Sequence, residues 1–264
     1  MAPTQRERIA LSEWNVVPDP ADHYSSGIAD LDRLLGGGYR RGSLALLSHD
    51  GTVEPGDLEL LTTPTLLNFL YQSRGVLSVL PARLSPHEFR SHLIRWVSRR
   101  RFDSRVRIVS YIGEDLEAPY VVDLRASAHS KSGQAPAKVV RQRTKRDMER
   151  MVQAEKAVRG ARGRMFLEML AFEIAEMVVG TETATRMFFH GIKRVHAVGN
   201  LCLGILRPGL GCADSVRALA EVELALHRDR EGLTIRGIRP SFPVVRVRAD
   251  PQHGAPRVSL VPGA

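Results

Sequence analysis

The chain has 264 residues, of which 43% are hydrophobic and 25% charged, a composition that suits one large α/β domain with a full core. No apolar run approaches the roughly 20 residues that a membrane-spanning helix needs. The polar N-terminus also lacks the apolar stretch of a secretory signal. We therefore expect a cytoplasmic protein without membrane contact, and the formal net charge of +9 favours anionic partners.

Residues 1–24 are expected to form a loosely held arm, because Pro18 and Pro20 interrupt regular structure. The apolar residues of 28–35 then recur at helical spacing, and the glycines at 36–38 end that helix. The apolar run 42–48, bounded by turn signals, predicts a buried strand.

A glycine-bearing loop is expected over 49–57, followed by a helix over 58–72 that Pro64 could interrupt. A second strand is predicted at 76–80. The segment 85–88 has the pattern of a capping box with proline at the first helical position. A third strand is expected at 105–111.

The second half continues the alternation of strands and helices. We expect strands at 164–168 and 201–206, a helix at 181–198, and short alternating strands at 221–226, 233–238 and 244–248. This order predicts a mainly parallel central sheet flanked by helices, with antiparallel strands near the C-terminus. The resulting division is an arm at 1–24, one α/β domain at 25–248 with a basic helical insertion at about 115–162, and a Pro/Gly tail at 249–264.

Between the first strand and the next helix, the spacing of two glycines resembles a phosphate-binding loop. Such loops hold phosphate with backbone N–H groups and a helix N-terminus, and their signature is G-x-x-x-x-G-K-[ST]. Gly51 and Gly56 have the required spacing, with Thr52 between them. Asp57 stands where lysine belongs, and Leu58 stands where serine or threonine belongs. The alternative is that the two glycines only form a turn before a helix.

No alignment can supply the missing lysine, because the first 130 residues contain none. A second register places Thr62 and Thr63 at the hydroxyl position and Leu61 at the lysine position. The carboxylates of Asp57 and Glu54 would repel a triphosphate by about 4 kcal/mol per close pair of charges. The arginines that could substitute from outside the loop are Arg40, Arg41 and Arg74.

The segment before this loop carries a more specific resemblance. Residues 27–38 read GIADLDRLLGGG and residues 41–47 read RGSLALL, which is similar to the segment that leads into the phosphate-loop strand of the RecA/KaiC-type ATPases. Residues 164–170 resemble the family's Walker B strand, and residues 199–206 resemble its next core strand. The resemblance covers about residues 25–248 apart from 115–162, and it implies a RecA-like P-loop fold.

The resemblance also implies that hydrolysis has been lost. The family uses an aspartate at the end of the Walker B strand, where this chain has Glu168, which could instead be a buried acid paired with an arginine. The family's catalytic glutamate follows the second strand, where this chain runs Leu80-Pro81-Ala82-Arg83 without an acid. Phosphoryl transfer depends on positioned charge of this kind. We therefore expect no catalytic residues and no cofactor, although weak binding of ATP and magnesium stays an alternative.

Ten basic residues against three acidic ones fall within 131–162. A nucleic-acid contact is one interpretation, since neutralising phosphates releases counterions. The other is a solvated helical face, because no aromatic residues interleave for base stacking. The candidate contacts are Lys138, Arg141, Arg143, Lys145, Arg146 and Arg150.

Cys202 and Cys212 lack the spacing of a metal or redox motif, so we predict buried thiols and no metal site. The function that the sequence favours is a non-hydrolysing regulatory or scaffolding protein that acts through a protein partner or an oligomer of RecA-like subunits. The alternatives are a DNA-binding RecA paralogue and an ATPase with a non-standard loop.

Overall fold

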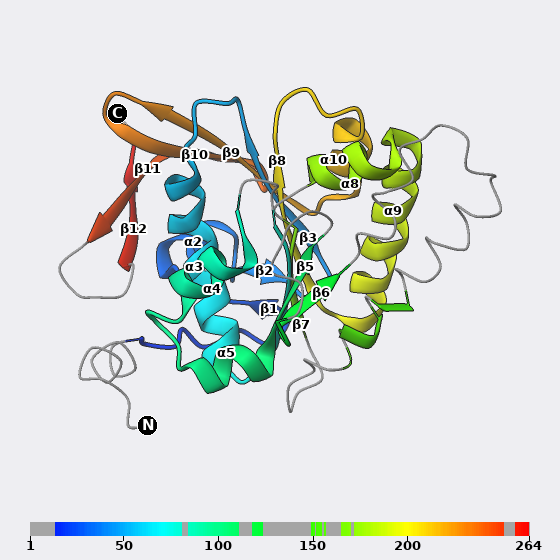
Figure 1. The fold of residues 1–264 in the computed structure, drawn as a ribbon. Coiled ribbons are helices and arrows are strands. Elements are labelled where there is room, and N and C mark those ends of the chain that lie inside the picture. Colours follow the sequence, from blue (N-terminus) through cyan, green and yellow to red (C-terminus); the bar gives the residue numbers. More distant parts are fainter. Residues whose placement is uncertain are drawn as a thin grey trace.

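A computed structural model gives the fold and describes residues 14–80, 84–110, 118–123, 149–150, 152–154, 156, 165–169, 172–250 and 257–263. A ten-stranded sheet in the order β12-β11-β10-β9-β3-β8-β7-β4-β5-β6 runs through the molecule (Figure 1). The strands from β9 to β6 in this order are parallel to their neighbours, and β9, β10, β11 and β12 pair antiparallel. The expected fold, a mainly parallel sheet with antiparallel C-terminal strands, is confirmed.

The strands of this sheet are β3 (Leu44–His49), β4 (Gly75–Val79), β5 (Val106–Ser110), β6 (Val121–Asp123), β7 (Met165–Met169), β8 (Leu201–Leu206), β9 (Val222–Asp229), β10 (Gly232–Arg239), β11 (Phe242–Asp250) and β12 (Arg257–Pro262). A separate pair joins β1 (His23–Tyr24) to β2 (Tyr39–Arg40). β3 and β8, the central strands, are apolar and buried along almost their whole length, as strands covered on both faces must be.

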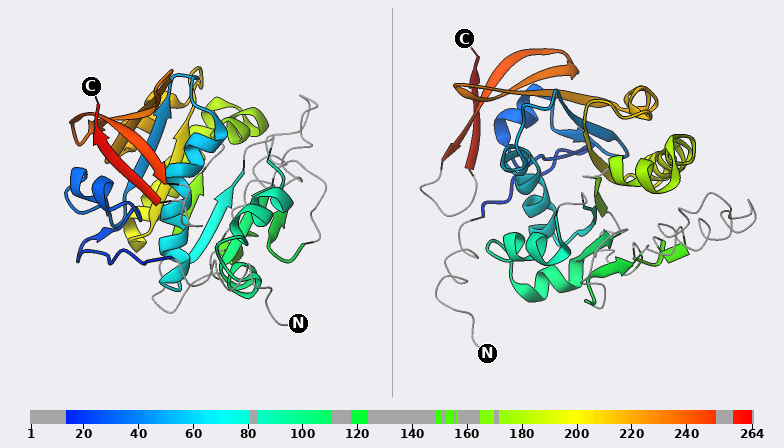
Figure 2. Two further views of the ribbon diagram at one scale, coloured as in Figure 1. Left: turned by 90° about the vertical axis from the view of Figure 1, so that its left-hand side faces the viewer. Right: turned by 45° about the horizontal axis from the view of Figure 1, so that its top comes forward.

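Helices cover both faces of the sheet (Figures 1 and 2). One layer contains α2 (Ala29–Leu34), α3 (Pro55–Tyr71), α4 (Pro86–Leu93) and α5 (Arg99–Arg105), and the other contains α8 (Phe172–Val179), α9 (Thr181–Val198) and α10 (Ala213–Leu219). The first layer packs a large apolar cluster around Phe69 and Phe166, and the second packs a smaller one around Phe172 and Phe188.

Helix α3 begins earlier than the sequence suggested. The expected loop over 49–57 ends at Glu54, because Pro55 occupies the first helical position and Asp57 caps the helix from its third. Pro64 does not interrupt the helix, which continues to Tyr71. Tertiary packing outweighs the local cost of this proline, since Pro64 and the six residues that follow it are all buried.

Several elements were not anticipated at all. The sequence reasoning missed α5, α8 and α10, and it assigned residues 257–262 to a tail, whereas they form β12. β12 lies against α2 and α3 (Figure 2), where the Leu260 N–H donates to the Asp30 carboxylate at 3.1 Å. Among the described helices, none combines the length and apolar character that crossing a bilayer requires.

One fully buried charge fixes the described part of the N-terminal arm. The side chain of Arg74, 1% exposed, packs against the rings of both Tyr24 and Phe69, whose centroids are 4.9 and 5.0 Å from its guanidinium carbon. Its guanidinium forms an ion pair with Asp19, which also accepts from the Ser25 N–H at 3.0 Å. The arm is therefore held by a buried ion pair at this point and is not loose along its whole length.

This arrangement predicts an asymmetric response to mutation. Asp19→Ala leaves the Arg74 charge buried without a partner, so the free energy of unfolding should fall by about 3–5 kcal/mol. Arg33→Ala removes an exposed pair with Asp30 and should cost less than about 1 kcal/mol. Urea titration followed by circular dichroism measures both variants, and equal losses would contradict the assignment.

Candidate functional site

The candidate loop joins the carboxyl end of β3 to the N-terminus of α3, the position at which α/β folds bind phosphate. Gly51 has a φ of +98°, a conformation that favours glycine. Gly56, Asp57 and Leu58 lie within the first turn of α3. The structure thus brings the loop residues Gly51 and Thr52 together with that first turn.

Four backbone donors of this loop and of the first turn of α3 have acceptors nearby. The Gly51 N–H donates to His49 Nδ1 at 3.2 Å, and the Thr52 N–H donates to Asp50 Oδ1 at 3.0 Å. The Glu54 N–H donates to Asp57 Oδ2 at 3.0 Å, and the Asp57 N–H donates to the Glu54 carbonyl at 3.0 Å. Donors of this kind would meet a bound phosphate in a nucleotide-binding loop, and here two of them meet carboxylates instead.

Asp57 also neutralises the nearby cation. Its side chain is 5% exposed and forms an ion pair with Arg228 at the end of β9. The Arg228 N–H donates to Thr52 Oγ1 at 2.9 Å, so the same residue holds both ends of the loop. The charge that a phosphate would need is therefore paired with a carboxylate from the lysine position of the motif.

A second carboxylate fixes the middle of the loop. The hydroxyl and backbone N–H of Thr52 donate to Asp50, and together with His227 they hold its pKa well below the usual range. His227 Nδ1 lies 2.6 Å from Asp50 Oδ2 and 3.4 Å from Thr52 Oγ1. Both partners contact the same ring nitrogen, so the imidazole cannot relay a proton from the threonine to the aspartate through its two nitrogens.

The cations proposed as substitutes for the missing lysine lie elsewhere. Arg74 is paired with Asp19, and the guanidinium of Arg41 lies over the ring of Tyr24 at 5.3 Å. Arg228, the cation that does reach the loop, was missed because it is 171 residues from Asp57 in the chain. No local sequence signal connects the two positions.

The alternative register of the motif does not fit the helix. Thr62 and Thr63 lie two turns into α3, so their hydroxyl groups are far from its N-terminus. Both residues line a neighbouring cavity instead. The register with Asp57 at the lysine position is the one compatible with the helix boundary.

A cavity of about 800 Å³ opens beside the loop, between α3 and α4 on one side and α8 on the other. Its walls are mainly apolar and include Leu58, Leu66, Phe89, Leu93, Trp96, Ile174, Met177 and Ile205. A volume of this size is within the range of small-molecule sites. The apolar walls, however, offer little to a polyphosphate.

A few polar groups lie at the loop end of the cavity. Glu173 Oε1 is 3.7 Å from the guanidinium of Arg207, and its other oxygen is buried without a hydrogen-bond partner. Burial, and then the charge of Arg207, lower the pKa of His49. The group therefore contains one loosely paired arginine and an imidazole that favours its neutral form.

The remaining predicted site residues are only partly described. The backbone of Glu168 lies in β7, in register with Ser78 of β4 and Leu203 of β8. Of the basic candidates, Arg150 is described and exposed. Lys138, Arg141, Arg143, Lys145 and Arg146 lie outside the described residues.

The two cysteines are buried, as predicted, and neither forms a disulfide. Burial raises the pKa of Cys202 to about 12, and burial together with the neighbouring Glu176 raises that of Cys212 to about 12. Neither thiol therefore favours the nucleophilic thiolate. The described side chains contain no group of histidines, cysteines and acids that could hold a metal ion.

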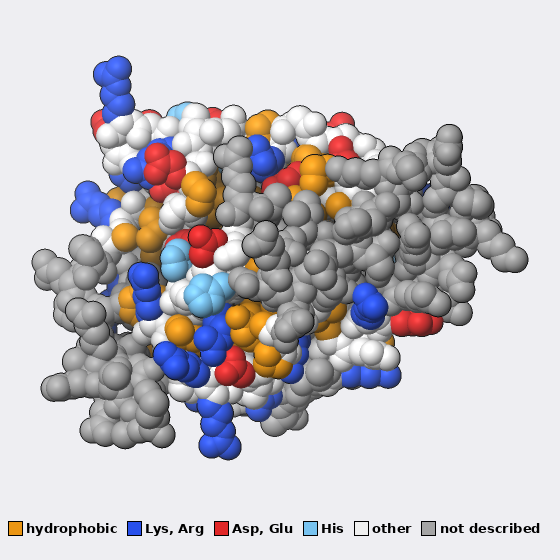
Figure 3. Space-filling model, viewed as in Figure 1, with side chains coloured by type: hydrophobic (Ala, Val, Ile, Leu, Met, Phe, Trp, Pro, Cys, Tyr) orange, Lys and Arg blue, Asp and Glu red, His pale blue; other side chains and the backbone are white. Residues whose placement is uncertain are grey.

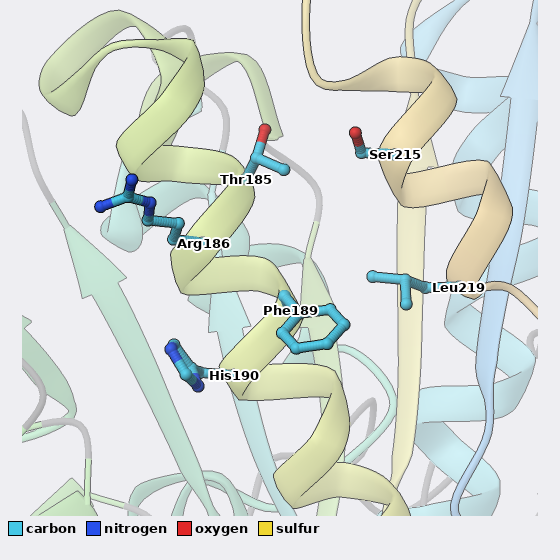
Figure 4. Close-up of a pocket in the computed structure, with 6 residues that line it drawn as sticks. All are labelled: Thr185, Arg186, Phe189, His190, Ser215 and Leu219. Atoms are coloured by element: carbon cyan, nitrogen blue, oxygen red, sulfur yellow. The ribbon is translucent and has the colours of Figure 1, made fainter.

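A second, smaller hollow of about 340 Å³ separates α9 from α10. Figure 4 shows Phe189 of α9 and Leu219 of α10 pointing toward each other across it, with Thr185 and Ser215 at one end. The Lys193 ammonium lies 4.4 Å from the centroid of the Phe189 ring, which is 39% exposed as a residue. This surface offers apolar contact area rather than catalytic groups.

Comparison with solved structures defines the class of protein. The fold matches a KaiC-like protein from the hyperthermophilic archaeon Pyrococcus horikoshii with a TM-score of 0.59 at 13% identity, covering 92% of this chain and 100% of the other. An uncharacterized protein from the same organism, solved with an unknown peptide, matches with a TM-score of 0.59 at 14% identity over 90% and 99% of the two chains. The chain has a RecA/KaiC-like fold, as its sequence predicted.

The family is more specific than the fold. Residues 13–181 match the family described as GvpD basic region 2, and the chain belongs to that family. Protein GvpD1 of Halobacterium salinarum is 37% identical over 91 residues, which is 34% of this chain and 17% of GvpD1. Protein GvpD2 of the same organism is 30% identical over 111 residues, which is 42% of this chain and 23% of GvpD2. The matched stretches thus span less than a quarter of either relative.

The structural role of Asp57 can be tested directly. Asp57→Ala removes the acceptor of the Glu54 N–H and the partner of Arg228, so it should lower the free energy of unfolding by about 1–3 kcal/mol. Glu59→Ala, on the same helix at a half-exposed position beside His92, should change it by less than about 0.5 kcal/mol. Denaturant titration measures both variants, and an unchanged Asp57→Ala protein would show that the loop does not depend on this carboxylate.

Proposed function

We propose that this chain is a non-hydrolysing regulatory or scaffolding member of its family, which acts through protein partners rather than through phosphoryl transfer. The main support is the loop between β3 and α3, where Asp57 replaces the phosphate-binding lysine. Its carboxylate accepts a loop N–H and pairs with Arg228, so one donor and one cation that a nucleotide could use already have a partner.

Charge repulsion and missing contacts both oppose nucleotide binding at this loop. A triphosphate at this loop would meet the carboxylates of Asp50 and Asp57, and Leu58 offers no hydroxyl for magnesium. Enzymes that catalyse phosphoryl transfer hold positioned cations next to the phosphates. We accordingly propose that the protein needs no cofactor. We also propose, from its sequence composition, that it works in the cytoplasm.

Exposed apolar side chains support a protein partner. Among the described residues, Met177, Phe189 and Val198 are exposed large hydrophobic side chains on α8 and α9, and Phe189 borders the hollow shown in Figure 4. Such side chains are typical of the centre of protein interfaces. RecA-like domains commonly assemble side by side, so another RecA-like subunit is a natural partner.

Calorimetry tests the loss of nucleotide binding. Titration of the unmodified protein with MgATP should give no saturable heat up to about 1 mM, which corresponds to a binding free energy weaker than about 4 kcal/mol. Asp57→Lys combined with Leu58→Ser restores the lysine and hydroxyl of the motif and should bind MgATP at least about tenfold more tightly. Glu59→Lys makes the same charge change outside the loop and should gain much less.

A milder variant serves as a second test in case the double variant does not fold. Asp57→Asn removes only the charge and should also increase the affinity for MgATP, while circular dichroism confirms its fold. Micromolar binding by the unmodified protein, with ATP turnover that disappears in Glu168→Gln, would overturn the proposal in favour of an active ATPase.

Site-specific crosslinking tests the protein partner. A benzophenone-bearing phenylalanine analogue is placed at Phe189, 39% exposed, and at Ile238, 38% exposed on β10, in cells of the native host. We expect a discrete protein adduct from position 189 and none from position 238. An adduct of twice the chain mass would identify a second copy as the partner, and absence of any adduct at 189 would contradict this surface.

A further inference from the structure

Seven arginines fall within residues 90–107, against a single acid, Asp103. The window therefore carries six of the nine net positive charges, because the rest of the chain has 31 basic and 28 acidic residues. It covers the end of α4, the whole of α5 and the start of β5. This concentration lies outside the insertion that the sequence analysis considered for nucleic acid.

The fold places α5 and the start of β5 at one end of the molecule, whereas Arg95, which precedes α5, also lines the apolar cavity between α3, α4 and α8. Helix α5 leads into the start of β5, whereas the phosphate loop follows the end of the parallel strand β3, so the two features lie at opposite ends of the sheet. Lys and Arg side chains gather at the lower end of the face in Figure 3, over the region where Figure 1 places α5.

Uncharged groups orient several of these arginines. Arg90 pairs with Asp103 at 3.2 Å, which is the one carboxylate of the window. Arg105 donates to the carbonyl of Ser73 at 2.8 Å, and Arg107 donates to the carbonyl of Asp103 at 2.9 Å. Uncharged acceptors of this kind orient a guanidinium but leave its positive charge in place.

A neighbouring ring fixes another member of the group. The guanidinium of Arg101 lies over the ring of Tyr71, 4.5 Å from its centroid. Stacking on an aromatic ring holds the planar guanidinium and also leaves its charge intact. Among the described contacts, Arg90 with Asp103 is a pair of opposite charges, whereas Arg101 and Arg105 are oriented by uncharged groups.

Three more arginines, Arg95, Arg99 and Arg100, are exposed. Arg99 and Arg100 occupy the first turn of α5, which contains no acid, although a helix N-terminus disfavours positive charge. Helix formation does not call for arginine at these positions. Departures from local preference of this kind are expected where a residue serves function.

The chemistry of the surface distinguishes between anionic partners. The exposed large hydrophobic side chains of the described residues are Val16, Met177, Phe189, Val198, Ile238 and Val244, all of which lie outside this window. Protein interfaces have an apolar centre that is depleted in charge, whereas nucleic-acid interfaces are polar and strongly positive. The arginine-rich window therefore fits a phosphate backbone better than an acidic protein.

We propose that α5 and its flanking residues form a binding face for the phosphate backbone of a nucleic acid. Seven helical residues span about 10 Å, which is close to three phosphates of one strand at about 3.4 Å each along a duplex. Contacts to phosphate carry no base information, so the binding tolerates any sequence. The inference is independent of the proposed function, because it uses neither the phosphate loop nor α9.

Fluorescence anisotropy tests the proposal with a labelled duplex DNA of arbitrary sequence and a labelled single-stranded RNA, at low and high salt. Arg95→Gln/Arg99→Gln/Arg100→Gln should weaken binding at about 50 mM salt by at least about tenfold and reduce the salt slope of log K by roughly 2 to 3. The matched control is Arg230→Gln/Arg236→Gln/Arg248→Gln, which removes the same charge from exposed positions elsewhere. It should change the affinity far less.

Each outcome has a defined consequence. Tighter binding of the DNA or of the RNA, lost in the α5 variant alone, supports the proposal and identifies the nucleic acid. Absence of binding by the unmodified protein at about 50 mM salt overturns it, since charge-driven contacts are strongest there. Equal weakening by both triple variants overturns it as an effect of net charge. Equally tight binding of polyglutamate, with the same sensitivity to the α5 variant, overturns it in favour of an acidic protein partner.

Discussion

The N-terminus of α3 carries partial positive charge from its unpaired N–H groups, and in this chain a carboxylate of the helix itself occupies that position. Asp57 accepts the Glu54 N–H from within the first turn and pairs with Arg228 from β9. One side chain thus caps the helix, closes the loop and ties the loop to the antiparallel part of the sheet. The positive end of this helix is therefore met by a carboxylate of the protein itself.

This closure explains the character of the adjoining cavity. The loop donors are directed to Asp50, Asp57 and neighbouring carbonyls, so the space between α3, α4 and α8 is bounded mainly by apolar side chains. Glu173 and Arg207 remain as a loosely paired polar group near the loop. The mainly apolar walls offer few polar contacts to a polyphosphate.

The charges of the molecule are separated between its two ends. At the carboxyl end of the central strands, acids and bases are paired within the loop, as in the contacts of Asp50 with His227 and Asp57 with Arg228. At the opposite end, three arginines around α5 are oriented by carbonyl oxygens and an aromatic ring.

The sequence by itself determined the fold class, because buried apolar strands and the glycine-rich segment before the loop are local patterns. It also determined that lysine is absent from the loop, since the first 130 residues contain none. The predicted start of α3 was wrong. The helix begins at Pro55, before Gly56, because proline suits the first helical position and Asp57 caps the helix. The short helix α5 was missed because its run of arginines lacks apolar periodicity.

Only the tertiary structure decided which charges meet. The pairing of Asp57 with Arg228 joins residues 171 positions apart, and the pairing of Arg74 with Asp19 joins residues 55 positions apart. Sheet pairing and helix packing set these distances, and no sequence pattern encodes them. Motif spacing can therefore show that a phosphate-binding lysine is missing, whereas the identity of the groups that satisfy the loop depends on contacts that form only when β9 is placed beside β3.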